Sequence, residues 1–141
     1  MRILAIETSC DETGISILET SGALGSISPR AQITVLADVL LSQASIHAEY
    51  GGVFPALARR EHAKNIIPLL VRALATADLV SVLKNPRTLI AREEEAFAKI
   101  FHKQPELLAK FKEEMLSLGR PGIDAIAVTS GPGLEPALWV G

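Results

Sequence analysis

Reactive side chains gather in the eight residues 7–14, which hold three carboxylates, three hydroxyls and the only cysteine of the chain, and which end in a glycine. A plain hairpin turn needs only a pair such as Asn-Gly or Asp-Gly. The backbone amides of a tight turn can cradle a phosphate, and Asp11 and Glu12 suit a divalent cation, a positioned water or a substrate donor. We therefore expect this loop to meet a phosphate-bearing ligand. A solvated acidic turn is the alternative.

Within this loop, Ser9 and Thr13 are expected to donate hydrogen bonds to the ligand. Cys10 would be a nucleophile only beside a base in an electropositive setting, and the acidic neighbours of this thiol raise its pKa instead.

A second loop, Ser130-Gly-Pro-Gly-Leu134, follows an apolar run and precedes the start of a helix. Free backbone N–H groups at a helix start favour anion binding in this geometry. The loop does not fit the G-x-S-x-G pattern of hydrolases, and no P-loop pattern occurs in the chain.

The three histidines, His47, His62 and His102, form neither H-x-x-x-H nor H-E-x-x-H, so no metal site is predicted within this chain. His62 is expected at the surface or at a cap. The basic residues Arg59, Arg60 and Lys64 could touch RNA phosphates, but a solvated helix face is the simpler interpretation.

Apolar periodicity predicts the elements that hold the two loops. An apolar alternation indicates strands, and a three- and four-residue spacing indicates helices. A buried strand is expected at the end of this series. The expected elements are a β-hairpin of 3–6 and 15–18, a turn at 20–30, a strand at 32–44, a helix at 53–77, a helix at about 86–102, a helix from 105 to about 118, and a strand at 123–129.

Two features modify this pattern. Pro68 should kink the helix at 53–77 or start a second one, because proline lacks the N–H of a helical bond. Residues 84–120 are rich in charge and read as an αα-hairpin inserted before the last strand. The sequence therefore predicts an α/β fold, with a mixed sheet and packed helices.

Composition limits the protein class. The chain has 141 residues, of which 48% are hydrophobic, so one domain with a core is expected. Its net charge of −2 gives no global attraction to nucleic acid. One cysteine excludes a disulfide within the chain, and no signal peptide or membrane span is evident. We expect a soluble, cytoplasmic protein.

Three stretches together resemble the bacterial TsaD family, the tRNA N6-adenosine threonylcarbamoyltransferases once described as glycoproteases: IETSCDETG at 6–14, HAEYGGVFPALARREH at 47–62 and SGPGL at 130–134. The resemblance implies an actin-like ATPase fold of the ribonuclease H-like type, with two lobes closing on a nucleotide. It implies that residues 1–141 are the N-terminal lobe and that the second lobe is absent. Residues 84–120 depart from the family as an insertion.

The resemblance also implies an activity, which is transfer of a threonylcarbamoyl group from threonylcarbamoyl-adenylate to N6 of the adenosine 3′ of the anticodon, with release of AMP. Asp11 and Glu12 would be catalytic. An iron or zinc ion would be held by ligands outside this chain, so the chain alone should be inactive. The implied partners are tRNA, a TsaB-like dimer partner and a TsaE-like ATPase. The residues implied to face the nucleotide or acyl-adenylate are Ser9, Cys10, Thr13, Gly131, Pro132 and Gly133.

Two other functions stay open. The chain could be a non-catalytic dimerisation or regulatory lobe, in the manner of TsaB. It could also belong to a small-molecule kinase or ATPase on the same fold.

Overall fold

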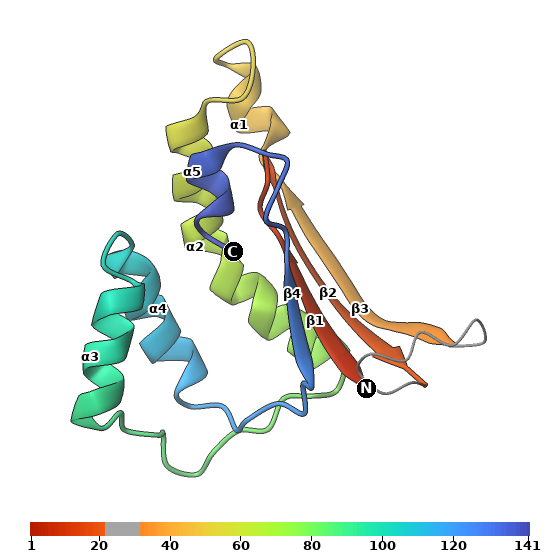
Figure 1. The fold of residues 1–141 in the computed structure, drawn as a ribbon, viewed down its shortest axis with the longest axis vertical. Coiled ribbons are helices and arrows are strands. Elements are labelled where there is room, and N and C mark those ends of the chain that lie inside the picture. Colours follow the sequence, from red (N-terminus) through yellow and green to blue (C-terminus); the bar gives the residue numbers. More distant parts are fainter. Residues whose placement is uncertain (22–31) are drawn as a thin grey trace.

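The computed structural model describes residues 1–21 and 32–141. A twisted sheet forms one layer, the long helix α2 (Pro55–Thr76) crosses one of its faces, and a pair of helices stands beyond α2 (Figure 1). Most of the turn predicted at 20–30 lies outside the described residues.

The sheet has four strands in the order β3-β2-β1-β4. The hairpin partners β1 (Arg2–Glu7) and β2 (Glu12–Thr20) are antiparallel, and β3 (Ile33–Ser42) continues the meander. The last strand, β4 (Ala125–Val128), runs parallel to β1 on its other side. The predicted hairpin, third strand and mixed sheet are confirmed.

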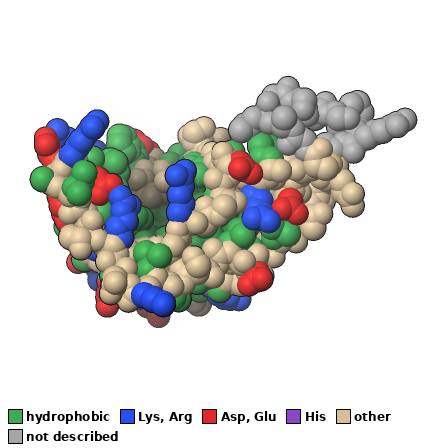
Figure 2. All heavy atoms as spheres, turned by 90° about the horizontal axis from the view of Figure 1, so that it is seen from below, with side chains coloured by type: hydrophobic (Ala, Val, Ile, Leu, Met, Phe, Trp, Pro, Cys, Tyr) green, Lys and Arg blue, Asp and Glu red, His purple; other side chains and the backbone are tan. Residues whose placement is uncertain are grey.

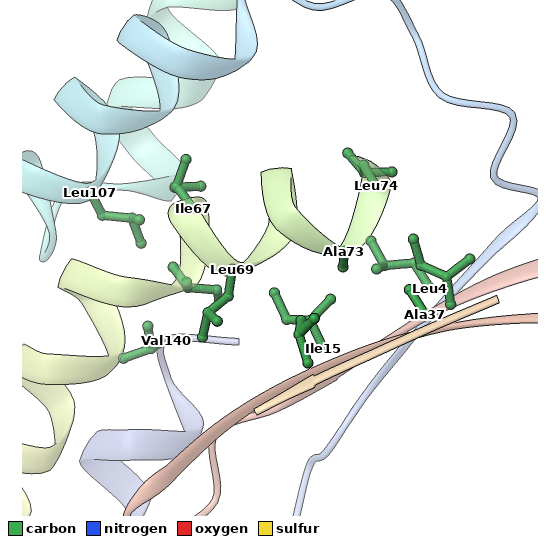
Figure 3. Close-up of a cluster of buried hydrophobic side chains, with 12 residues drawn as sticks. Leu4, Ile15, Ala37, Ile67, Leu69, Ala73, Leu74, Leu107 and Val140 are labelled. Carbon is green, nitrogen blue, oxygen red and sulfur yellow. The ribbon is translucent and has the colours of Figure 1, made fainter. Parts of the chain in front are cut away.

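Alternation along β2 builds the core. Thr13, Ile15 and Ile17 are buried on one face, while the residues between them face the other way, as the two-residue period of a strand requires. Figure 3 shows Ile15 of β2 and Leu4 of β1 pointing toward residues of α2. The apolar stripe of α2 therefore packs on the sheet.

Helix α2 runs through Pro68 as one element, so a second helix does not start there. Proline cannot bond the carbonyl of the residue four positions earlier, which is Lys64. The Nζ of Lys110, from the neighbouring helix α4 (Pro105–Met115), donates to that Lys64 carbonyl at 3.2 Å. The ribbon of α2 also changes direction part-way along its length (Figure 1). A distant lysine thus satisfies the oxygen that the proline leaves without its helical partner.

The predicted helical pair is present as α3 (Ala91–Ile100) and α4. Phe97, Phe101 and Phe111 form an aromatic cluster inside the pair, with ring centroids 5.3–6.2 Å apart. Leu107 is buried against α2 and fixes the pair to the rest of the chain. Charges of both signs lie over the pair, and a hollow separates it from the sheet side (Figure 2).

The prediction of a buried last strand is wrong. Ile126 and Val128 of β4 are 66% and 44% exposed. The reason is that β4 is an edge strand, and α2 packs on β2 and β3 instead. The apolar sequence of β4 predicts burial, but among the described residues no helix covers Ile126 and Val128, and the sequence alone does not show this.

Two short helices complete the described residues. Helix α1 (Ala44–Ala48), which the pattern did not predict, joins β3 to α2, and α5 (Glu135–Leu138) packs on α2. Within residues 1–21 and 32–141, no helix has the length and apolar character needed to cross a membrane.

Candidate functional site

The two predicted loops lie against each other. They follow β1 and β4, which are parallel neighbours, so their carboxyl ends meet at the same end of the sheet. The backbone N–H of Leu134 donates to the carbonyl of Ser9 at 2.7 Å. A Cβ at Gly133 would lie 2.6 Å from that carbonyl oxygen and 2.7 Å from Ser9 Cβ, which leaves no room for a side chain. Glycine at 133 is thus required for the two loops to meet.

Glu7 joins the same two loops from the end of β1. Its carboxylate accepts the Ser9 backbone N–H at 2.6 Å and also the hydroxyl of Thr129. Burial raises the pKa of Glu7, but the hydrogen bonds from Ser9 and Thr129 outweigh burial and bring the pKa below its ordinary value. Glu7 is therefore a charged structural link. Sequence reasoning counted it only as one more loop carboxylate.

Thr8 ties the first loop to α5. Its buried hydroxyl donates to the carbonyl of Ala137 at 3.0 Å. Residues 7–9 thus bond to three points on the segment 129–137, which makes the paired loops one unit.

The residues predicted to be catalytic lie at the outer part of the first loop. Glu12 is exposed and Asp11 is half-buried, so both carboxylates can reach a ligand. The backbone carbonyl of Asp11 accepts the N–H of Gln43 at 2.8 Å, which anchors the loop to the end of β3.

Cys10 is exposed and has no disulfide partner. Burial and the neighbouring carboxylate of Asp11 raise the pKa of this thiol. A raised pKa leaves less of the thiol ionised at neutral pH, which disfavours its use as a nucleophile.

Thr13 does not present its hydroxyl to solvent. It is fully buried, and its Oγ1 lies 2.7 Å from Nδ1 of His62. The expectation that His62 lies at the surface or at a cap is wrong, because this side chain is 0% exposed. The ring of His62 reaches the carbonyl of Cys10, so this part of α2 packs against the first loop.

His62 belongs to a chain of buried polar side chains. Its Nδ1 also lies 3.2 Å from Nε2 of Gln43, and its Nε2 lies 3.0 Å from the carbonyl of Cys10. Gln43 continues the chain to Nε2 of His47 at 3.1 Å, and Nδ1 of His47 accepts the backbone N–H of Phe54 at 3.3 Å. Sequence reasoning missed this group, although two histidines at 47 and 62 flanking a helix start gave a signal.

Burial lowers the pKa of His62 below its ordinary value of 6.5, against the raising effects of the Cys10 carbonyl and the Glu7 and Asp11 carboxylates. The side chain is accordingly neutral at physiological pH.

The second loop lies beside a shallow surface hollow. Gly131 has a φ of +150°, a conformation that favours glycine, and its peptide bond to Pro132 is cis. Ser130 and Gly133 line a hollow of about 350 Å³ with the start of α5. A second hollow of about 370 Å³ lies on the open face of the sheet, where Glu7 and Thr129 form part of its wall.

A metal ion does not fit the residues of this site. Among the described residues, no group of three His, Cys, Asp or Glu side chains converges. Both ring nitrogens of His47 and of His62 already have hydrogen-bond partners, so neither ring offers a free lone pair.

Residues 34–82 match the family described as TsaD: tRNA N6-adenosine threonylcarbamoyltransferase. The matched segment covers most of β3, then α1 and α2, and so includes Gln43, His47 and His62. The two loops at 7–14 and 129–134 lie outside it.

Proposed function

This chain carries a TsaD-family segment, and from that premise we propose that it takes part in threonylcarbamoyl transfer to N6 of the adenosine 3′ of the anticodon in tRNA. The donor is threonylcarbamoyl-adenylate, and AMP is released. The observation that supports the proposal is the meeting of the two loops at Ser9 and Gly133, in the same loop that carries the exposed Glu12.

In this proposal, residues 9–12 of the first loop face the phosphate of the acyl-adenylate, and Thr13 supports them through its buried bond to His62. Gly131, Pro132 and Gly133 shape the other side of the same cleft. Attack by an amine on the carbamoyl carbon releases a proton, which a carboxylate within reach can accept. Asp11 and Glu12 supply such groups, while the two loops hold the donor in place.

The chain is proposed to be the N-terminal lobe of a two-lobed, cytoplasmic enzyme, with residues 84–120 as an insertion. The second lobe and the ligands of an iron or zinc ion then lie outside this chain. The proposed partners are tRNA, a TsaB-like protein and a TsaE-like ATPase. A groove with Arg59, Arg60 and Lys103 in its wall, along with Glu106, supports contact with tRNA phosphates.

A second candidate is a non-catalytic lobe that binds a partner. The exposed apolar side chains of Ile126 and Val128 on β4 favour it, because such side chains at a sheet edge are suited to a protein contact. Light scattering with a TsaB-like protein tests it, and a chain that stays monomeric and unbound would exclude it.

The coding sequence beyond codon 141 provides the first test of the transferase. An H-x-x-x-H motif followed by a second lobe supports it, and a stop codon directly after Gly141 transfers support to the partner-binding lobe.

The complete enzyme provides the second test. Asp11→Ala and Glu12→Ala should each reduce tRNA modification at least about 100-fold, which is the usual contribution of a general acid or base. Their unfolding midpoints should stay near that of the parent, since Glu12 is exposed and Asp11 is only half-buried. Glu113→Ala, on the exposed side of α4, is the matched control and should keep full activity. Unchanged modification in both loop variants would remove these carboxylates from the site.

A further inference from the structure

We propose that His62 is a positioning residue that clamps the ligand-binding loop at two points, on either side of Asp11 and Glu12. The Nε2 of His62 meets the carbonyl of Cys10, and its Nδ1 meets the hydroxyl of Thr13. The contacts of His62 are independent of the proposed function, but their role in ligand binding rests on it.

The hydrogen-bond directions follow from the fixed end of the chain. The N–H of Phe54 can only donate, so Nδ1 of His47 accepts and its Nε2–H donates to Oε1 of Gln43. The amide nitrogen of Gln43 then donates to Nδ1 of His62.

Nδ1 of His62 consequently carries no hydrogen, and it accepts from both Gln43 and Thr13. The hydrogen lies on Nε2, which donates to the carbonyl of Cys10. Every member of the chain is satisfied in this one arrangement. An imidazolium would break it, since a second ring N–H would face the amide hydrogens of Gln43.

Packing alone does not explain this group. The side chains of Thr13, Gln43, His47 and His62 are all at least 98% buried, and apolar residues of similar volume would fill the same space without any need for partners. What the polar atoms add is a hold on the backbone of loop 8–11, which lies between strands and has no ladder partner for most of its length.

The clamp therefore fixes the part of the chain that carries the proposed catalytic carboxylates. Cys10 and Thr13 are held by the ring of His62, and the carbonyl of Asp11 is held by the backbone N–H of Gln43. Because the two residues between the clamp points have little freedom left, their carboxylates are pre-positioned for a ligand.

The first experiment measures the ring directly in the ¹⁵N-labelled chain. The ¹⁵N shifts of His62 should show a protonated Nε2 and an unprotonated Nδ1 at pH 7. A ring with hydrogen on Nδ1, or one that is charged at pH 7, would overturn the proposal.

The second experiment compares substitutions at residue 62 by backbone order parameters of residues 10–12. In His62→Gln the amide nitrogen takes the place of Nε2 and keeps the bond to Cys10, so these residues should stay ordered, at about 0.85. In His62→Ala they should fall below about 0.6. The core variant Leu74→Ala, which is remote from the loop, controls for lost stability and should leave the loop ordered. Equal order in the alanine variant and the parent would refute the clamp.

A third measurement links the clamp to ligand binding, with AMP as the probe. If the parent binds AMP, His62→Ala should weaken binding at least about tenfold, whereas His62→Gln should stay within about threefold. Equal affinity in all of them would overturn the role in positioning. If neither this chain nor the complete two-lobed enzyme binds AMP, the proposed function fails, and the ring and order measurements still decide whether His62 clamps the loop.

Discussion

The sharpest test of the paired loops is Gly133→Ala. The added methyl group would lie 2.6 Å from the carbonyl oxygen of Ser9 and 2.7 Å from its Cβ. Carbon atoms in contact prefer a separation of about 3.5–4.0 Å, so the two loops must move apart by roughly 1 Å. That movement also strains the 2.7 Å bond from the Leu134 N–H to the Ser9 carbonyl.

The cost follows from overpacking, which destabilises a well-packed contact by about 1–3 kcal/mol. Backbone atoms of Ser9 are among those that the methyl group meets, and they cannot swing aside as the end of a flexible side chain does. We therefore expect a loss of about 2 kcal/mol in the free energy of unfolding. With a urea slope of roughly 2 kcal/mol per M, the midpoint falls by about 1 M.

Urea unfolding followed by circular dichroism measures this shift, and Gly52→Ala is the matched control. A Cβ at Gly52 meets nothing within 4 Å, and its φ is not in the left-handed region. Alanine at such a site leaves stability unchanged or raises it by about 0.4–1 kcal/mol, through the unfolded chain. If Gly133→Ala unfolds at the same urea concentration as Gly52→Ala, the close contact between the loops is wrong.

Further predictions concern pH and the helical pair. Because the pKa of His62 is lowered by burial, the unfolded chain binds a proton before the folded one does, so stability is full above pH 6.5 and falls as pH decreases below it. The slope from this residue is at most about 1.4 kcal/mol per pH unit, and urea midpoints at pH 7.5, 6.5 and 5.5 should reveal it; His62→Gln should lack it, and an unaltered slope there would assign it to another group. Leu107→Ala should cost about 2–4 kcal/mol, since this buried side chain joins α4 to α2. Lys112→Ala, in a partly exposed ion pair with Glu94, should cost less than about 1 kcal/mol, and an equal loss in both variants would argue against docking through Leu107.

Local pattern was sufficient for most of the fold. The alternation of β2 and the three- and four-residue spacing of α2 each reflect the geometry of one element, so they can be read without its neighbours. The same applies to the helical pair, where Pro105 starts the second helix and the phenylalanines mark its inner face. The sequence indicated the hairpin and a third strand beside it, but it did not place the last strand next to β1.

The candidate site was predicted only in part. The composition of the loops at 7–14 and 130–134 marks them as candidates, and the sequence places Gly133 in the second loop without showing its contact with Ser9. The role of Glu7 was not visible, because it depends on Thr129, which is 122 residues away in the sequence.

Tertiary structure decided whatever depends on residues that are distant along the chain. His62 is buried because α2 lies under the first loop, and Thr13 faces inward because it meets His62 there. Helix α2 continues through Pro68 with Lys110 bonded to the Lys64 carbonyl. Burial and hydrogen bonding at these places are properties of pairs of segments. The sequence by itself determines the hydrophobic period and the chemistry of each segment. Only packing determines which segment becomes the partner in each contact.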